Sequence, residues 1–240
     1  MDSVSPKFLT LARKLLNDHP IICDIGSRDA LEGIYLLQQL NAKTLHVFEP
    51  NPAAAKVCLQ NLAGFIDGRV HFNQVAITDK VGELHFYPVN SELSGNKDIG
   101  FSSLFRINPD YTRRRGQIVQ DEITVDATTL DNYFSGKQPP DLLWVDVEGA
   151  ELQALQGAAN VLKHVKLIHI EVSFRPMQIG KPLFEEIERF LSKHNFTFYR
   201  FMEASALRSF LYRNKLLPNL PWRLNAVFYK GSGCSPLSTD

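Results

Sequence analysis

The hydrophobic positions of this chain fall into short apolar runs that alternate with longer segments of helical period. Such runs predict strands, and apolar side chains that recur every three to four residues predict amphipathic helices. The predicted strands are residues 21–25, 44–49, 70–77, 141–147, 166–172 and 224–230. The predicted helices between them are residues 51–62, 149–162 and 181–195. This alternation is typical of parallel strands with crossover helices, so we expect an α/β fold with a doubly wound, mostly parallel sheet.

The first twenty residues carry a different pattern. Apolar side chains stand at helical spacing at Phe8, Leu11, Ala12, Leu15 and Leu16. Ser5 and Pro6 form a typical helix start, and the polar face has few cations. We therefore expect residues 1–20 to hold an amphipathic helix that packs on the domain, rather than a helix on a membrane surface. Residues 21–230 are expected to form one domain, and residues 231–240 a disordered tail.

Residues 84–125 interrupt the alternation with a long polar stretch between strand-like ends. A loop of this length inside a compact domain is usually functional or disordered. We expect this segment to be an insertion that covers the active site.

The composition narrows the class of protein. With 240 residues the chain suits one substantial domain. Lys plus Arg and Asp plus Glu both number 26, so no overall positive field would attract nucleic acid or an anionic membrane. Cys23, Cys58 and Cys234 form no CxxC pattern, which argues against a disulfide scaffold and a cysteine zinc site. We expect a cytoplasmic protein without nucleic-acid partners, and without stable membrane insertion because no continuous apolar stretch has the required length.

The turn after the first predicted strand, "IICDIGSRDALEG" at residues 21–33, indicates what the sheet binds. A dinucleotide fingerprint has small residues at three glycine positions, so that the backbone can approach a pyrophosphate. Here Gly26 is followed by Arg28 and Leu31 at the other two positions, and Asp29 would repel an anion. The turn therefore disfavours a nicotinamide dehydrogenase.

Two acidic residues flank this turn instead. Asp24 ends the first predicted strand, where it could also cap the turn, and Glu49 ends the second. The Glu49 carboxylate can accept hydrogen bonds from both hydroxyls of a ribose; its alternative role is to place charge before the next helix. These residues favour a ligand with a cationic end and a ribose but no phosphate. S-adenosylmethionine is such a ligand.

A second group of acidic residues lies at later strand ends. Asp146 and Glu148 are two residues apart, so they share a face of a strand, and a metal, a shared proton or a cationic substrate must offset their repulsion. Glu171 follows on the neighbouring strand, two residues after His169, which we interpret as a core histidine. We predict Asp146, Glu148 and Glu171 as candidate catalytic residues. Which of them is the base stays open, as does a role for a divalent metal, and no metal ligands are assigned.

Several segments resemble one known family. "DIGSRDALEG" resembles motif I of class I methyltransferases, and "VFEPNP" resembles their acidic ribose-binding strand end. "LLWVDVEGAELQALQGA" is similar to the DxEGxE segment of the FkbM family, and "VAITDKVGELHFY", "FSSLF", "TTLDNYF" and "IHIEVSF" also resemble that family, in the same order. The resemblance runs from about Ile21 to about Phe198. The chain departs from the family at its glycine-poor turn and at Trp144, where many members have Lys.

The resemblance implies a Rossmann-like class I methyltransferase domain whose seven-stranded sheet has an antiparallel last strand. It also implies S-adenosylmethionine as cofactor and transfer of a methyl group to a hydroxyl. We therefore expect an O-methyltransferase that acts on a small-molecule or glycan acceptor, namely a sugar, glycan or glycolipid. The alternative is a non-catalytic S-adenosylmethionine-binding domain that acts as an interaction module. The sequence indicates neither the oligomeric state nor the identity of the acceptor.

The resemblance and the strand ends together predict the cofactor site. The predicted residues are Asp24, Gly26, Ser27, Arg28, Glu49, Pro50, Asn51, Ala76, Ile77, Ser102, Ser103 and Asp146. Ala76 and Ile77 would flank the adenine but suit a core equally well, and Ser102 and Ser103 would close over the methionine moiety. The covering segment also carries the cationic run at residues 113–115, which is solvated surface unless it steers an anionic acceptor such as a nucleotide sugar or glycolipid.

Overall fold

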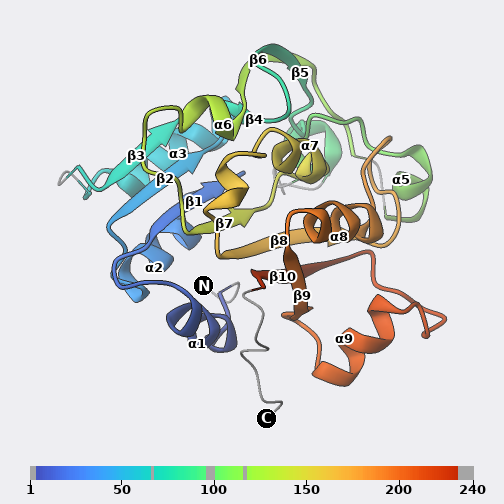
Figure 1. Ribbon diagram of the computed structural model, residues 1–240. Coiled ribbons are helices and arrows are strands. Elements are labelled where there is room, and N and C mark those ends of the chain that lie inside the picture. Colours follow the sequence, from blue (N-terminus) through green and yellow to red (C-terminus); the bar gives the residue numbers. More distant parts are fainter. Residues whose placement is uncertain (1–3, 66–67, 96–100, 116–117, 232–240) are drawn as a thin grey trace.

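A seven-stranded sheet forms the centre of the molecule (Figure 1). The structure is a computed structural model that describes residues 4–65, 68–95, 101–115 and 118–231. The strand order is β3-β2-β1-β7-β8-β10-β9. The strands are β1 (Ile21–Ile25), β2 (Thr44–Phe48), β3 (Val70–Asn73), β7 (Leu142–Val145), β8 (Leu167–Ser173), β9 (Phe196–Phe201) and β10 (Arg223–Lys230). Neighbours from β3 to β8 are parallel, whereas β10 is antiparallel to both β8 and β9. These pairings confirm the predicted doubly wound sheet with an antiparallel last strand.

Helices cover both faces of this sheet. Successive strand residues point to opposite faces, and the strands carry apolar side chains on both, so each face needs a layer of helices. The helices whose side chains join one core cluster are α1 (Pro6–Leu15), α2 (Leu31–Gln39) and α3 (Pro52–Leu62). The elements of the opposite cluster are α6 (Leu130–Tyr133), α7 (Glu151–Gln156), the 3-10 turn η2 (Val161–Lys163) and α8 (Phe184–Lys193). In β1, Ile22 belongs to the first cluster and Cys23 to the second. Helix α9 (Ala206–Arg213) lies between β9 and β10 in the chain (Figure 1).

The predicted N-terminal helix is present as α1. The Ser5 hydroxyl accepts a hydrogen bond from the Phe8 amide at 3.2 Å, and Pro6 occupies the first helical position. Phe8, Leu11 and Ala12 are buried against the sheet. The helix therefore packs on the domain, as its pattern predicts.

The predicted strand 70–77 is wrong as a single strand. Its ladder with β2 ends at Asn73, whose side-chain amide donates to the carbonyl oxygens of Val47 and His71. The chain then leaves the large sheet, and β4 (Ala76–Ile77) joins a separate sheet of order β4-β6-β5. The other strands of that sheet are β5 (Gly82–Phe86) and β6 (Ile123–Thr128).

Two further elements differ clearly from the prediction. The helix expected over 149–162 ends at Gln156, and the 3-10 turn η2 follows it. At Gly157 the chain passes the Thr78 carbonyl so closely that a Cβ would come within 2.1 Å of its oxygen. Strand β9 is not among the predicted strands, and its phenylalanines at 196, 198 and 201 do not keep a strict alternation. It is an edge strand of the sheet, and only its first and last residues are buried.

The segment 84–125 begins and ends in strands, β5 and β6, as its pattern predicts. Its middle contains the short helices α4 (Ser91–Ser94) and α5 (Pro109–Arg115), so it is not a structureless loop. Residues 96–100 and 116–117 lie outside the described residues, as does the tail predicted to be disordered apart from Gly231. The division of the chain into an N-terminal helix, a domain with a cover and a tail stays a prediction. In the described part of the chain, no helix combines the length and apolar character that a membrane span requires.

Candidate functional site

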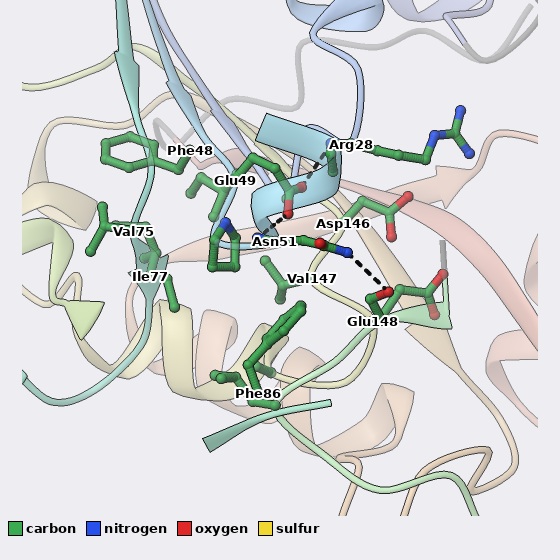
Figure 2. Close-up of a pocket in the computed structure, with 18 residues that line it drawn as sticks. Arg28, Phe48, Glu49, Asn51, Val75, Ile77, Phe86, Asp146, Val147 and Glu148 are labelled. Atoms are coloured by element: carbon green, nitrogen blue, oxygen red, sulfur yellow. Dashed lines mark hydrogen bonds between the residues drawn. The ribbon is translucent and has the colours of Figure 1, made fainter. Parts of the chain in front are cut away.

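The strand order reverses between β1 and β7, and ligands of doubly wound sheets bind beyond the carboxyl ends of the strands at such a point. A hollow lies there, which we call the first hollow (Figure 2). The predicted residues that line it are Gly26, Arg28, Glu49, Pro50, Asn51, Ala76, Ile77, Ser102 and Asp146. The candidate catalytic residue Glu148 also lines it.

The turn after β1 depends on one glycine. Gly26 has a φ of 81°, and a Cβ at this position would lie 1.9 Å from the carbonyl oxygen of Asp146. The amides of Gly26 and Ser27 donate to the Phe48 carbonyl at 2.9 and 3.2 Å. Arg28 and Ala30 also adopt positive φ angles, at 54° and 64°. A single glycine, Gly26, therefore allows the chain after β1 to pass close to the end of β7.

The Glu49 carboxylate is fixed in the wall of the first hollow. Oε1 accepts the Asn51 amide at 2.8 Å, and Oε2 accepts the Arg28 amide at 2.9 Å. Burial raises the pKa of Glu49, and these two backbone hydrogen bonds oppose the increase. Each carboxylate oxygen has a further lone pair, so the group can still accept hydrogen bonds from a ligand.

The two ends of the first hollow differ in chemistry. Figure 2 shows Phe48, Val75 and Ile77 at one end and Asp146 and Glu148 at the other. Phe86 and Leu104 add further apolar surface to the lining. The hollow can therefore hold a molecule with a flat apolar ring at one end and a cationic group at the other.

Sequence reasoning missed most of the apolar lining. Phe48 and Val75 stand next to predicted residues, at the end of a predicted strand and just before Ala76. Proximity in the chain could have indicated them. Phe86 and Leu104 come from the segment 84–125, and no pattern in that segment indicates which of its side chains reach the sheet.

Three residues predicted for the cofactor site, Asp24, Ser27 and Ser103, do not line the first hollow. Asp24 is buried beneath the turn, where Oδ2 accepts the Ser27 hydroxyl, and it lines neither the first hollow nor its neighbours. Burial raises the pKa of Asp24 to about 7. Ser27 lines a small adjoining hollow with Arg28 and Glu32.

Ser103 fastens its segment to the chain just after β7. Its hydroxyl donates to the Glu148 carbonyl at 2.6 Å and accepts the Phe105 amide at 3.0 Å. Ser102, in contrast, lines the first hollow, where its hydroxyl accepts the Val89 amide and the Asn51 side-chain amide. The structure thus places one of the two serines at the hollow and the other in a structural contact.

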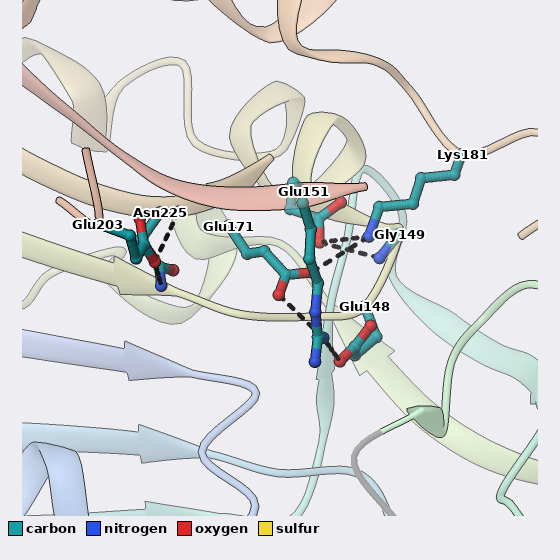
Figure 3. Close-up of polar contacts among 8 residues, drawn as sticks. Glu148, Gly149, Glu151, Glu171, Lys181, Glu203 and Asn225 are labelled. Atoms are coloured by element: carbon teal, nitrogen blue, oxygen red, sulfur yellow. Dashed lines mark hydrogen bonds and ion pairs between the residues drawn. The ribbon is translucent and has the colours of Figure 1, made fainter. Parts of the chain in front are cut away.

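The candidate catalytic carboxylates belong to a larger charged cluster (Figure 3). Arg223 Nη1 lies 2.8 Å from Glu148 Oε1 and 3.0 Å from Glu171 Oε2. Lys181 Nζ lies 3.4 Å from Glu171 Oε1 and 3.7 Å from Glu151 Oε1. Glu151 also accepts the Gly149 amide at 2.9 Å. Two cations of the chain therefore compensate three of its glutamates.

This environment makes two of the carboxyl groups unusually basic. Burial and the charges of Glu171 and Glu148 raise the pKa of Asp146 well above its ordinary value. Burial and the charge of Glu171 raise the pKa of Glu148 to about 8. Oδ1 of Asp146 has no hydrogen-bond partner within the described chain. Oε2 of Glu148, at the same hollow, is likewise unpartnered among the described residues, but Glu148 already pairs with Arg223 through Oε1. Both carboxyl groups therefore have an oxygen that can accept a proton at the first hollow, and Asp146 is the one not held by Arg223 in an ion pair.

Three of these carboxylates meet the geometric requirement of a metal site. Single oxygens of Asp146, Glu148 and Glu171 lie within 4.8 Å of one another, and carboxylate oxygens suit magnesium and calcium. Arg223 Nη1 already contacts two of the three. The cationic charge that Glu148 and Glu171 require is therefore supplied by the protein itself.

The two cations of the cluster were not predicted. Lys181 precedes α8 and is buried, whereas lysine is almost never fully buried without a charged partner. Arg223 is the first residue of β10, one position before the predicted strand. Neither position carries a local signal, because their partners lie at least ten residues away in the chain.

Comparison with known proteins is consistent with this geometry. Residues 24–198 match the family model described as the methyltransferase FkbM domain. The chain is 32% identical over 165 residues to the 2-O-methyltransferase NoeI of Sinorhizobium fredii, which covers 68% of this chain and 67% of that protein.

Two solved structures share the fold. The methyltransferase FkbM of Methylobacillus flagellatus has a TM-score of 0.54 at 14% identity, over 94% of this chain and 50% of that chain. Sp1610 of Streptococcus pneumoniae in complex with S-adenosyl-L-methionine has a TM-score of 0.50 at 11% identity, over 95% of this chain and 74% of that chain. The chain thus spans about half the length of the solved FkbM protein.

Proposed function

The chain belongs to the FkbM methyltransferase family, and on this basis we propose that it transfers a methyl group from S-adenosylmethionine to a hydroxyl of a sugar, glycan or glycolipid. One observation carries the proposal: the first hollow joins an apolar end to a carboxylate end at the point where the strand order reverses. The name of NoeI, a 2-O-methyltransferase, supports oxygen as the atom that accepts the methyl group.

The residues of the first hollow suit each part of S-adenosylmethionine. Val75, Ile77 and Phe48 offer apolar surface for the adenine, and the fixed carboxylate of Glu49 can accept the ribose hydroxyls. Asp146 and Glu148 offer carboxyl oxygens to the methionine ammonium, and the positive charge of that group would favour their ionised forms. The hollow contains Arg28, but the Gly26 turn lacks the small residues with which a pyrophosphate-binding turn approaches its ligand.

Bound S-adenosylmethionine would supply an electrophilic methyl group on sulfur. The chain holds the acceptor hydroxyl in line with that group, so that the oxygen–carbon bond forms as the sulfur–carbon bond breaks. We assign Asp146, in its ionised form, as the base that accepts the hydroxyl proton, because its Oδ1 is unpartnered in the described chain whereas Glu148 already pairs with Arg223. S-adenosylhomocysteine and protonated Asp146 are the products that balance the step.

A screen for transferred methyl groups tests the proposal. The protein is incubated with S-adenosylmethionine that carries a deuterated methyl group and with sugars, glycolipids and polyketides, and products are detected by mass spectrometry. We expect a labelled methyl ether with the wild type and none with Asp146→Asn. If S-adenosylhomocysteine binds but no acceptor class is methylated, the alternative of a non-catalytic binding domain is supported. If neither is observed, the proposed function is wrong.

A further inference from the structure

A second hollow adjoins the first one. It has a volume of about 340 Å³ and shares Arg28, Asp146 and Glu148 with the lining of the first hollow. Small-molecule sites in proteins commonly have volumes of roughly 300 to 1,000 Å³. A molecule in the second hollow would therefore meet a molecule in the first at Asp146, the residue that we assign as the base.

The wall of the second hollow contains buried polar atoms that lack partners. His169 is 2% exposed, and neither of its ring nitrogens has a hydrogen-bond partner in the described chain. Oε2 of Glu148, which is 8% exposed, is also unpartnered there. A buried polar group without a partner costs about 1 to 3 kcal/mol. A ligand that brings hydroxyl groups into this hollow would give these atoms partners.

The ring of His169 is held in one orientation. It stacks on Trp144 with 3.5 Å between ring centroids and an interplanar angle of 2°, and Trp144 Nε1 donates to Glu32 Oε2 at 3.2 Å. Burial lowers the pKa of His169 to about 3, so the ring is neutral and offers one donor and one acceptor. A hydroxyl can pair with either nitrogen, because it both donates and accepts.

The charge of the second hollow restricts the ligand further. Its lining contains five carboxyl groups, from Glu32, Asp146, Glu148, Glu171 and Glu203, and two guanidinium groups, from Arg28 and Arg223. Acidic groups remain in excess even when the two groups with raised pKa, Asp146 and Glu148, hold their protons. A phosphate or carboxylate in this hollow would meet net repulsion.

Building on the proposed function, we propose that the second hollow binds the acceptor and that the part which enters is a polyhydroxylated ring without phosphate or carboxylate. Hydroxyls of the ring donate to Glu171 and Glu203, and the reacting hydroxyl lies at Asp146, between the two hollows. An amino group on the ring strengthens binding. In the cationic run at 113–115, Arg113 is exposed and pairs with Asp110 at 2.9 Å, as a residue of a solvated surface would.

Glu203 provides the test, because it is exposed and its replacement spares the core. Both of its oxygens accept the Asn225 amide at 3.1 Å, at the rim of the second hollow (Figure 3). Glu203→Arg reverses the charge at this rim. Glu83→Arg makes the same change on β5, at an exposed position that lines neither hollow, and serves as the control.

The experiment measures binding of glucose, glucosamine and glucuronic acid to protein saturated with S-adenosylhomocysteine, by ligand-observed NMR. For the wild type and Glu83→Arg we expect glucosamine to bind up to about fivefold more tightly than glucuronic acid, the largest difference that an ion pair at an exposed site provides. Glu203→Arg should invert this order without changing the affinity for S-adenosylhomocysteine.

Three results would overturn the proposal while S-adenosylhomocysteine still binds. They are preferential binding of glucuronic acid by the wild type, binding of none of the three rings, and an unchanged order in Glu203→Arg. If S-adenosylhomocysteine itself does not bind, the proposed function fails instead, so the two failures are distinguishable.

Discussion

Arg223 Nη1 lies 2.8 Å from Glu148 Oε1, although the two residues are 75 positions apart in the chain. The same nitrogen lies 3.0 Å from Glu171 Oε2. Arg223, the first residue of β10, thus links Glu148, which follows β7, to Glu171 in β8. Without Arg223, these carboxyl groups would face one another and Asp146 with one fewer compensating charge.

Replacement of Arg223 by Gln is expected to lower the free energy of unfolding by about 2 kcal/mol, which is typical of hydrogen bonds to a charged group. Urea denaturation measures the change. Arg213→Gln is the matched control, because Arg213 pairs with Glu188 at 2.7 Å on the surface and such pairs contribute at most about 1 kcal/mol. Equal losses in the two variants would show that the cluster adds nothing beyond a surface ion pair.

Removal of divalent metal ions by a chelator is expected to leave methyl transfer unchanged. Arg223 already supplies positive charge to Glu148 and Glu171, two of the three carboxylates that could hold an ion. The rate of methyl transfer is measured before and after chelation, with and without added magnesium. A loss of activity that magnesium restores would identify these carboxylates as metal ligands and contradict the role given to Arg223.

Gly26→Ala is expected to destabilise the fold and to abolish binding of S-adenosylhomocysteine, because the new Cβ would lie 1.9 Å from the Asp146 carbonyl oxygen. Gly136→Ala separates this clash from backbone strain. Gly136 has a similar φ, 74°, but no atom lies within 4 Å of a Cβ there, so only strain of about 1 to 3 kcal/mol is expected. Similar losses of stability in both variants would mean that the approach of β1 to β7 is not critical.

The sequence predicted the parts of the site that follow from single strands. Gly26, Glu49 and Asp146 each stand at or just after the carboxyl end of an apolar run, and parallel strands bring such ends to one edge of the sheet. The same reasoning placed Asp24 at the site. The structure instead places the Asp24 side chain beneath the turn. Its Oδ2 lies so close to Gly33 of α2 that a Cβ on Gly33 would be only 2.6 Å away.

Features that depend on contacts between distant segments could not be predicted. The break after Asn73 follows from pairing of Ala76 and Ile77 with β6, about fifty residues later. Lys181 and Arg223 acquire their roles only when α8 and β10 pack beside β8. Periodicity reports which face of one element is buried, but not which other element lies against it.

The raised pKa of Asp24 predicts a pH dependence of stability. The folded protein retains this proton up to a pH of about 7, whereas an ordinary Asp releases it near 3.8. The folded state therefore holds more protons between these values, and this contribution to stability is lost as the pH rises. Asp24→Asn cannot lose the proton, so its stability relative to wild type should increase with pH, by up to roughly 1.4 kcal/mol for each pH unit in this range.

Urea denaturation of both proteins at several pH values between these limits measures the difference. The control is Asp126→Asn on β6, because Asp126 is exposed and lines neither hollow. A constant difference between Asp24→Asn and wild type across the range would show that Asp24 is ionised in the folded state.

Titration of the protein with S-adenosylhomocysteine, followed by calorimetry, measures whether the first hollow binds the cofactor. We expect saturable binding that Glu49→Ala weakens by roughly 1.5 to 3 kcal/mol, because the variant loses a fixed carboxylate that accepts hydrogen bonds. Binding that is unchanged in Glu49→Ala would remove Glu49 from the site. The absence of any binding by the wild type would contradict the assignment of the first hollow as a cofactor site and, with it, the proposed methyl transfer.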